Sequence, residues 1–184
     1  EQRQWLNSFN EENYYLYQRQ NNDDEYDFKD SWNIRTDEGE TLADYLWSQL
    51  ITGDFTDEEQ EILKFMLECL DDKGYLEEDL GQIAKTFQAS PEKIEFLLET
   101  IQGLDPAGVG ARSLEECLKL QLVRRQMATP ALLAIVSQGL ELVAKNQVNT
   151  IARKFRLSAG EAAGCCQIIK SLNPKPGISF SSRE

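Results

Sequence analysis

The stretch Thr41–Leu50 (TLADYLWSQL) returns 72 residues later as Ser113–Leu122 (SLEECLKLQL). A second stretch, Ile83–Ser90 (IAKTFQAS), returns 68 residues later as Ile151–Ser158 (IARKFRLS). The two patterns keep the same order in both copies, and an isoleucine, a leucine and a proline follow each copy of the second one. Because self-similarity at a fixed period marks a repeated supersecondary unit, the chain is predicted to contain one unit twice.

Helix-start signals recur along both copies. A serine or threonine precedes an apolar series of helical period, in several places with proline directly after it or an acidic residue three positions on. No segment shows the sustained alternation of a strand. The sequence predicts an all-α fold of about eight helices in two repeated helical subdomains, each ending in a helix-turn-helix-like pair. The predicted starts are Thr41, Thr56, Ser90, Ser113, Thr129 and Ser158.

Ser113 and Glu116 have the spacing of a capping box. The helix that Pro130 opens is predicted to run unbroken through Leu140 and Val143, because apolar residues keep the helical period over that length.

Charge divides the chain unevenly. Residues 1–102 carry 8 Lys and Arg against 26 Asp and Glu, a net −18, whereas residues 103–184 carry 11 against 6, a net +5. Residues 1–40 alone hold 4 basic and 11 acidic residues, interleaved with aromatic ones. We predict an acidic, largely irregular and partly disordered segment that orders on a basic groove, such as one built for nucleic acid. A flexible linker is the alternative.

The predicted domain organisation follows from the repeat and the charge. Residues 1–40 are an acidic linker, residues 41–106 the first helical subdomain and residues 107–176 the second. Residues 177–184 are expected to begin a linker to a further domain that the sequence does not include.

Composition narrows the function classes. The chain has no histidine, and its four cysteines lack a CxxC spacing, so we predict no metal site, no cofactor and no enzymatic activity. A catalytic site built only from carboxylates or a lysine is the alternative, although no paired motif points to one. The cysteines are interpreted as small core residues in a reducing compartment. No apolar run approaches the length of a membrane span, and the first residues lack a signal-peptide pattern. A cytoplasmic protein without membrane contact is expected.

The connector between the repeats, residues 108–113, contains glycines and an arginine beside a helix start. It is not interpreted as a nucleotide loop, because no strand precedes it and the phosphate-loop spacing is incomplete. The glycines are expected to permit a tight turn, and Arg112 to pair with a nearby carboxylate or with a partner protein.

The second helices of the helix-turn-helix-like pairs do not look like sequence readers. In the first copy this helix carries three glutamates, which phosphates would repel, and in the second it offers no arginine or asparagine at the base-reading positions. Structural packing is therefore predicted for both. Arg153, Lys154 and Arg156 precede the second copy of this helix and are candidates for phosphate contacts.

The segment Leu104–Leu122 (LDPAGVGARSLEECLKLQL) resembles the signature of the sigma-54 family of bacterial RNA polymerase sigma factors. Leu70–Leu76, Thr41–Leu50 and Leu172–Gly177 agree with the same family, so the resemblance runs from about Thr41 to Phe180. Nineteen residues with flanking blocks in fixed order make this a specific match.

The resemblance implies a helical module that binds core RNA polymerase. It also implies that the acidic linker enters the nucleic-acid channel of the polymerase, and that the holoenzyme melts promoter DNA only when an ATP-hydrolysing AAA+ activator remodels it. The activator-receiving N-terminal region and the main promoter-reading domain of that family are not in this sequence. We therefore expect a fragment that binds polymerase, with promoter DNA binding weak or absent.

The expected polymerase contacts lie on the acidic face of the first repeat and in the connector, at Asp105, Arg112, Glu116 and Gln121. Four further residues are expected to shape the turn: Pro106, Gly108, Val109 and Gly110. Two alternatives remain from the residues alone. One is a helix-turn-helix DNA-binding protein, and the other is a non-enzymatic α-helical adaptor with an acidic tail.

Overall fold

The computed structural model describes residues 41–181. The predicted acidic segment, residues 1–40, lies outside the described residues, as do residues 182–184. Over the described range the regular structure is ten helices with two isolated β-bridges and no strand, which confirms the all-α prediction. Contacts divide this range into two compact units, residues 41–133 with 172–181, and residues 134–171. The subdomain boundary predicted between residues 106 and 107 stays a prediction.

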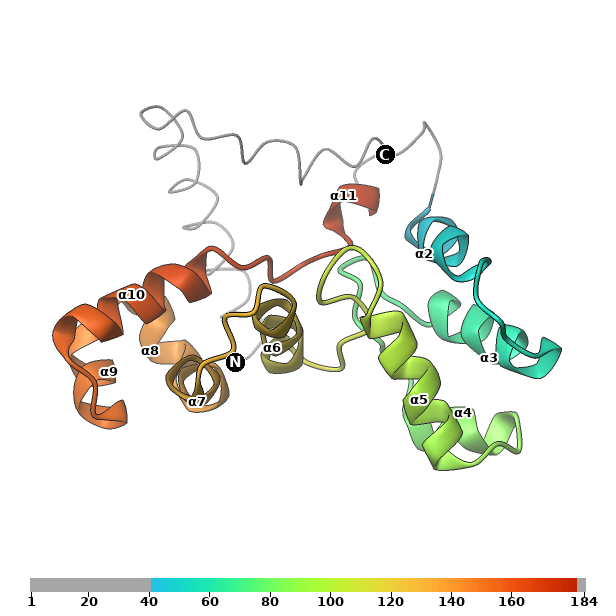
Figure 1. The fold of residues 1–184 in the computed structure, drawn as a ribbon, viewed down its shortest axis with the longest axis horizontal. Coiled ribbons are helices and arrows are strands. Elements are labelled where there is room, and N and C mark those ends of the chain that lie inside the picture. Colours follow the sequence, from blue (N-terminus) through green and yellow to red (C-terminus); the bar gives the residue numbers. More distant parts are fainter. Residues whose placement is uncertain (1–40, 182–184) are drawn as a thin grey trace. The chain divides into compact units, whose positions relative to one another are not determined.

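The first repeat forms four helices, α2 (Leu42–Leu50), α3 (Asp57–Glu68), α4 (Leu80–Thr86) and α5 (Pro91–Gln102) (Figure 1). Thr41 and Thr56 begin α2 and α3 with complete capping boxes, and the Ser90 side chain accepts from the N–H of Lys93 at the start of α5. Each cap satisfies backbone donors that the first helical turn leaves without a partner.

The second repeat begins with α6 (Leu114–Arg124) and continues with α7 (Pro130–Gln138), α8 (Leu140–Ala144), α9 (Val148–Phe155) and α10 (Ala159–Lys170); a short α11 (Ile178–Ser181) follows. Ser158 and Glu161 form a complete capping box at α10. In this repeat α7 and α8 together correspond to the single α3 of the first. That division and α11 account for ten helices where about eight were predicted.

The unbroken helix predicted from Pro130 through Val143 is wrong, because the chain breaks at Gly139. A Cβ atom there would lie 2.9 Å from the ring of Phe155 on α9, so the ring approaches the backbone where only glycine leaves room. The Lys154 ammonium donates to the Gln138 carbonyl at 2.6 Å. A cation at the C-terminal end of α7 satisfies a carbonyl that a continuous helix would have used.

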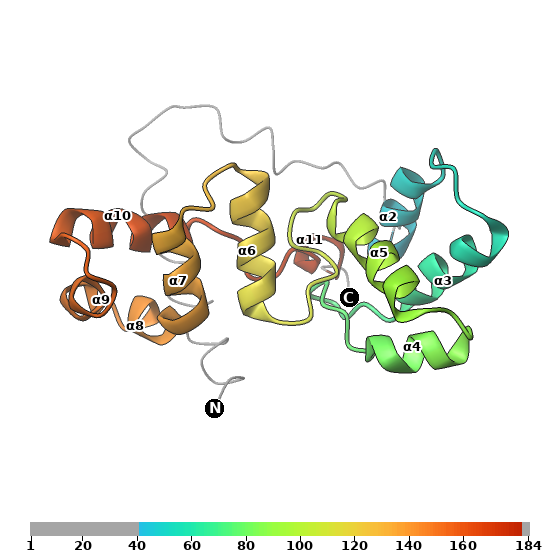
Figure 2. The same ribbon diagram turned by 60° about the horizontal axis from the view of Figure 1, so that its bottom comes forward.

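The larger unit has a continuous apolar core. α3 and α5 pack together, as do α4 with α5 and α2 with α3 (Figure 2). Buried side chains at helical spacing meet there and exclude water, which is the main favourable term in folding. The core comprises Leu46, Leu50, Ile62, Leu63, Met66, Leu67, Leu76, Ile83, Ala84, Ile94, Leu97, Leu98, Ile101 and Val109.

The smaller unit is built around the α9–α10 pair, with α8 packed against both helices. Its buried hydrophobic residues are Ile135, Val136, Val143, Ile151, Ala162, Cys166 and Ile169. The four cysteines of the chain are free thiols, with Cys117 and Cys166 buried. Burial raises the pKa of the Cys117 thiol to about 11, so this thiol stays protonated and unreactive near neutrality.

Two further findings concern the described residues only. No group of three or more potential metal ligands comes together among them. None of their helices is long and apolar enough to cross a membrane.

After α10 the chain returns to the larger unit as an irregular segment of bends and a turn, Leu172–Gly177, which we call the return segment. The Tyr75 hydroxyl donates to the Pro174 carbonyl at 2.5 Å, and the Gly177 N–H donates to the Lys73 carbonyl at 2.8 Å. Gly177 sits so close to Gly74 that an added Cβ would lie 2.8 Å from the Gly74 nitrogen. A backbone approach this tight requires glycine.

We predict that Gly177→Ala lowers the free energy of unfolding by about 1–3 kcal/mol, because the new methyl group overlaps backbone atoms that cannot move independently. Gly164→Ala on α10 is the matched control, since a Cβ there meets nothing within 4 Å. That control should stabilise the helix by up to about 1 kcal/mol. Urea denaturation followed by circular dichroism measures both. Equal effects of the two substitutions would contradict the close approach.

Candidate functional site

The loop between α5 and α6, residues 103–113, ends in the connector and is fixed by backbone hydrogen bonds on both sides. The Gly110 N–H donates to the Gly74 carbonyl at 2.8 Å, and the Leu76 N–H donates to the Ala111 carbonyl at 3.0 Å. Gly108 and Gly110 have φ of +95° and +72°, a region that favours glycine. The Asp105–Pro106 peptide is cis, and Val109 is fully buried. The connector is therefore part of the folded unit.

A glutamine clamps the chain in each repeat, and the two clamps are equivalent. The Gln49 side-chain amide donates to the Asp105 carbonyl at 2.7 Å and accepts from the Asp105 N–H at 2.9 Å. The Gln121 amide donates to the Asn173 carbonyl at 2.6 Å and accepts from the Asn173 N–H at 2.8 Å. Both clamped residues directly precede a proline. Each clamp thus ties the first helix of a repeat to the segment that follows its last helix.

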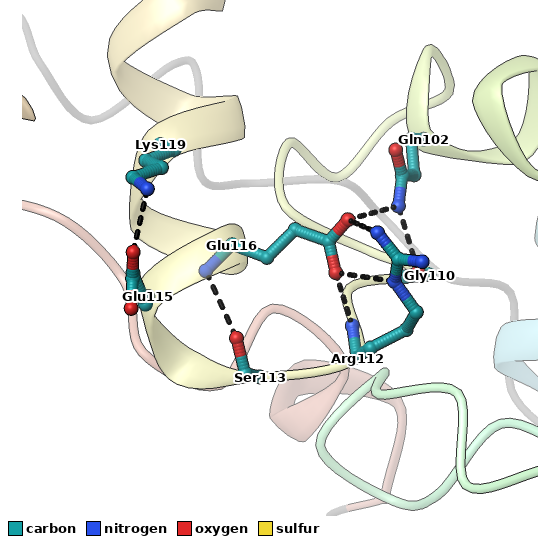
Figure 3. A network of polar contacts seen from close by, with 7 residues as sticks. All are labelled: Gln102, Gly110, Arg112, Ser113, Glu115, Glu116 and Lys119. Carbon is teal, nitrogen blue, oxygen red and sulfur yellow. Dashed lines mark hydrogen bonds and ion pairs between the residues drawn. The ribbon is translucent and has the colours of Figure 1, made fainter. Parts of the chain in front are cut away.

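Arg112 and Glu116 form the centre of a polar network (Figure 3). The Arg112 guanidinium donates two hydrogen bonds to the Glu116 carboxylate, at 2.7 and 3.0 Å, and the Arg112 N–H donates a third at 2.8 Å. Gln102 on α5 donates to the same carboxylate at 3.3 Å and to the Gly110 carbonyl at 3.1 Å. The network joins the end of α5, the connector and the start of α6.

The predicted capping box at Ser113 is half correct. The Glu116 N–H does donate to the Ser113 hydroxyl, at 3.2 Å. In a complete capping box the Glu116 carboxylate would accept from the N–H of the N-cap residue, Ser113. It accepts instead from the N–H and the guanidinium of Arg112, the preceding residue. A bidentate pair with a guanidinium is stronger than a single hydrogen bond from a neutral N–H. Arg112 is thereby confirmed to pair with a nearby carboxylate.

Comparison of the sequence with known proteins identifies its family. The sequence matches the model of the sigma-54 factor core-binding domain over residues 31–184. The chain belongs to the sigma-54 factor family. It is 34% identical over 171 residues, or 89% of its length, to the RNA polymerase sigma-54 factor of Pseudomonas aeruginosa. It is 33% identical over 144 residues, or 78% of its length, to that of Bacillus subtilis. It spans about a third of the length of these relatives.

Three of the residues expected to contact polymerase in this sigma-54 family chain have partners inside the larger unit. Asp105 is held by Gln49 and forms an ion pair with Arg124 at 2.6 Å. The Arg112 side chain pairs with Glu116 but remains 53% exposed, and Glu116 is 22% exposed. Their predicted contacts with polymerase stay predictions.

Gln121, the fourth, is only 3% exposed. Its amide is hydrogen-bonded to the backbone carbonyl and N–H of Asn173. The amide nitrogen also donates to the Cys117 sulfur at 3.3 Å. The structure gives this side chain an internal positioning role, and its predicted polymerase contact is untested. Gln49 and Arg124 were missed by sequence reasoning. The repeat held the signal for Gln49, because a glutamine recurs at the same position of both copies.

Arg153, Lys154 and Arg156, the candidates for phosphate contacts, all lie in the 134–171 unit and are exposed. They do not join the connector network. Phosphate contact at these residues stays a prediction.

An exposed acidic face with one aromatic residue lies on α5. Glu92, Glu95 and Glu99 are exposed along this helix, and Phe96 among them is 58% exposed. Glu95 also contributes, after Glu116, to the raised pKa of Arg112. The α5 face and the connector network are therefore close enough to interact electrostatically.

The clamps predict unequal losses of stability. Gln121→Met keeps the side-chain volume but leaves the Asn173 backbone groups without their partners in a largely buried site, and should cost about 1–3 kcal/mol of unfolding free energy. Gln49→Met affects a more exposed clamp that water can reach, and should cost less than about 1 kcal/mol. Chemical denaturation measures both. A loss at Gln49 as large as that at Gln121 would show that the buried clamp is not the stronger one.

The Glu116 carboxylate predicts a pH dependence. Burial raises its pKa, but the hydrogen bonds from the Arg112 side chain and N–H and from Gln102, with the Arg112 charge, outweigh burial, so the net pKa lies below the ordinary 4.5. The folded state thus favours the charged form, and the resulting stability is present above pH 4.5 and lost as pH falls through the lowered pKa. Glu116→Gln should destabilise the chain at pH 7 and progressively less below pH 4.5. A difference between variant and wild type that does not change with pH would contradict this.

Proposed function

We propose that this chain is the part of a sigma-54-type transcription initiation factor that binds core RNA polymerase. The observation that carries the proposal is the match of residues 31–184 to the core-binding domain of the family. The fold supports it, because the signature segment Leu104–Leu122 forms a fixed connector with exposed charged groups on a stable helical unit. Such a surface can be recognised by a protein partner without reordering of its backbone.

The acidic α5 face is the proposed centre of the contact. Protein interfaces concentrate binding energy in a few aromatic residues surrounded by polar groups. Phe96 has this setting, with Glu92, Glu95 and Glu99 around it. The equivalent helix of the second repeat, α10, has Gly160, Ala163, Gly164 and Gln167 at these four positions. A feature present in one copy and absent from the other is not required by the shared scaffold.

The connector extends this surface. Arg112 and Asp105 expose about half of their side chains while paired with Glu116 and Arg124. Exposed ion pairs contribute little to stability, so their charges remain available to a partner. We assign Arg112, Glu116 and Asp105 to the rim of the polymerase contact. Gln121 acts behind the rim by fixing the return segment.

The remaining proposals concern the whole protein and rest on the resemblance. The acidic residues 1–40, with a net charge of −7, enter the nucleic-acid channel of the polymerase, where their carboxylates stand in for phosphates. Promoter DNA recognition and response to an ATP-hydrolysing AAA+ activator belong to segments of the relatives that this chain does not span.

Phe96→Ala should weaken binding to core RNA polymerase by about tenfold or more, because truncation of an aromatic hot spot costs about 1–2 kcal/mol or more of binding energy. The melting temperature should stay unchanged, since Phe96 is largely exposed. Ile51→Ala is the matched control, because Ile51 is 69% exposed but lies at the end of α2 without carboxylates on both sides. Fluorescence anisotropy of labelled chain titrated with purified core polymerase measures both.

The proposal fails if the folded wild-type chain does not bind core polymerase, or if a competing sigma factor does not displace it. Unchanged affinity of Phe96→Ala would leave the polymerase assignment intact but move the contact away from α5. Charge reversal at Arg112 provides the corresponding check on the connector.

A further inference from the structure

Charge in the described residues is divided between the two compact units. The 134–171 unit holds five Lys and Arg against two acidic residues, a net +3, whereas the described residues of the larger unit hold nine against 18, a net −9. None of the five cations of the smaller unit forms an ion pair with a carboxylate of the described residues. A charge separation that follows a structural boundary indicates a different ligand for the smaller unit.

Three of the five cations lie at the end of α9 and in the turn that leads to α10. We call Arg153, Lys154 and Arg156 the basic corner. Arg156 ends α9 in the left-handed conformation (φ 56°, ψ 45°), and the Leu157 N–H closes the turn on the Ala152 carbonyl at 2.9 Å. Ile151 on the opposite side of α9 is fully buried. The side chains of the basic corner are thus exposed, while the apolar side of α9 packs against the rest of the unit.

The cations of this unit are not equivalent. Lys154 is tied to the Gln138 carbonyl, and Lys170 is tied to the Asn146 side chain. Arg153 and Arg156 have no such bond to another described residue. Arginine donates two hydrogen bonds to a phosphate in a planar arrangement. These two residues are therefore the best placed to hold an external anion.

The surroundings of the corner favour duplex nucleic acid over a protein or a single strand. All large apolar side chains that the described residues expose, namely Ile51, Phe96, Val123, Met127 and Ile178, lie outside the 134–171 unit. The corner therefore lacks the apolar anchors of a protein interface. It also lacks the exposed aromatic rings on which single-stranded bases stack. The basic corner therefore presents positive charge without apolar or aromatic contacts, which suits the phosphates of a duplex.

We propose that the 134–171 unit binds the sugar–phosphate backbone of duplex DNA through Arg153 and Arg156. This is a contact separate from the polymerase contact proposed for α5, and it does not depend on that proposal.

The contact is independent of base sequence. Gly160, Ala163 and Gln167 are exposed on α10, and among them only Gln167, at the far end of the helix from the corner, has a polar side chain. Glu161 is engaged in the capping box at the start of α10, where its carboxylate accepts from the Ser158 N–H at 2.8 Å. Phosphate contacts without base contacts fix position but not sequence.

The test compares three forms of the full chain by fluorescence anisotropy with a labelled duplex of arbitrary sequence at low salt. Wild type should bind, and the double variant Arg153→Gln/Arg156→Asn should bind about tenfold more weakly, with a salt dependence reduced by about two phosphate contacts. Asparagine is chosen at 156 because it tolerates the left-handed conformation. Lys85→Gln is the matched control, since Lys85 takes the place of Arg153 in the first repeat.

Each other outcome overturns the proposal. If wild type does not bind duplex DNA at concentrations up to about 100 µM, the proposal is wrong, since the dissociation constants of non-specific DNA binding lie at or below that concentration. Equal loss in Lys85→Gln means that general charge, not the corner, binds DNA. Equal affinity for a single strand contradicts the choice of duplex. A double variant that keeps its DNA affinity but loses core polymerase shows that the corner serves a protein.

Discussion

A glutamine side chain that holds both backbone groups of the residue before a proline is the interaction on which the larger unit depends. It occurs twice, as Gln49 on Asp105 and as Gln121 on Asn173. A side-chain amide satisfies one N–H and one carbonyl at once, which a loop without secondary structure otherwise leaves unpaired. The first clamp fixes Asp105, shortly before the connector. The second fixes the return segment, which in turn holds the turn at Gly74 against the connector.

The two repeats keep this scaffold and differ on their surfaces. α5 exposes Phe96 among glutamates, whereas α10 exposes glycine, alanine and glutamine at the equivalent positions. At the preceding turn, Lys85, Thr86 and Gln88 of the first copy become Arg153, Lys154 and Arg156 in the second. Gln88 and Arg156 both adopt positive φ, so the turn geometry is retained while its charge changes. This divergence is the basis of the protein contact proposed for α5 and of the phosphate contact proposed for the turn after α9.

Helix caps could be predicted from the sequence, because each cap involves residues that are close together along the chain. The caps at Thr41, Thr56, Ser90 and Ser158 involve residues three positions apart, and the structure has all of them. The repeat predicted the correspondence of the helices. The break at Gly139 depends instead on the ring of Phe155, a contact made across the fold. Apolar periodicity continues through Gly139 and gives no sign of it.

The site residues show the same limit. Asp105 and Glu116 were expected to contact a partner, and their internal partners Gln49, Arg124 and Gln102 lie 56, 19 and 14 positions away in the sequence. Gln121 was expected to contact polymerase, but its side chain is buried and bonded to Asn173, 52 positions along the sequence. The glutamine shared by both copies was the available signal, since a polar residue kept at one position of a diverging repeat serves the fold.

The claim that the repeats have taken different roles is tested most directly by photo-crosslinking. Benzoylphenylalanine replaces either Phe96 or its equivalent Gly164, where an added Cβ meets nothing within 4 Å, and each chain is irradiated with purified core RNA polymerase. The account predicts a crosslink to polymerase from position 96 and none from position 164. Crosslinks of equal yield from both positions, or from position 164 alone, would contradict it.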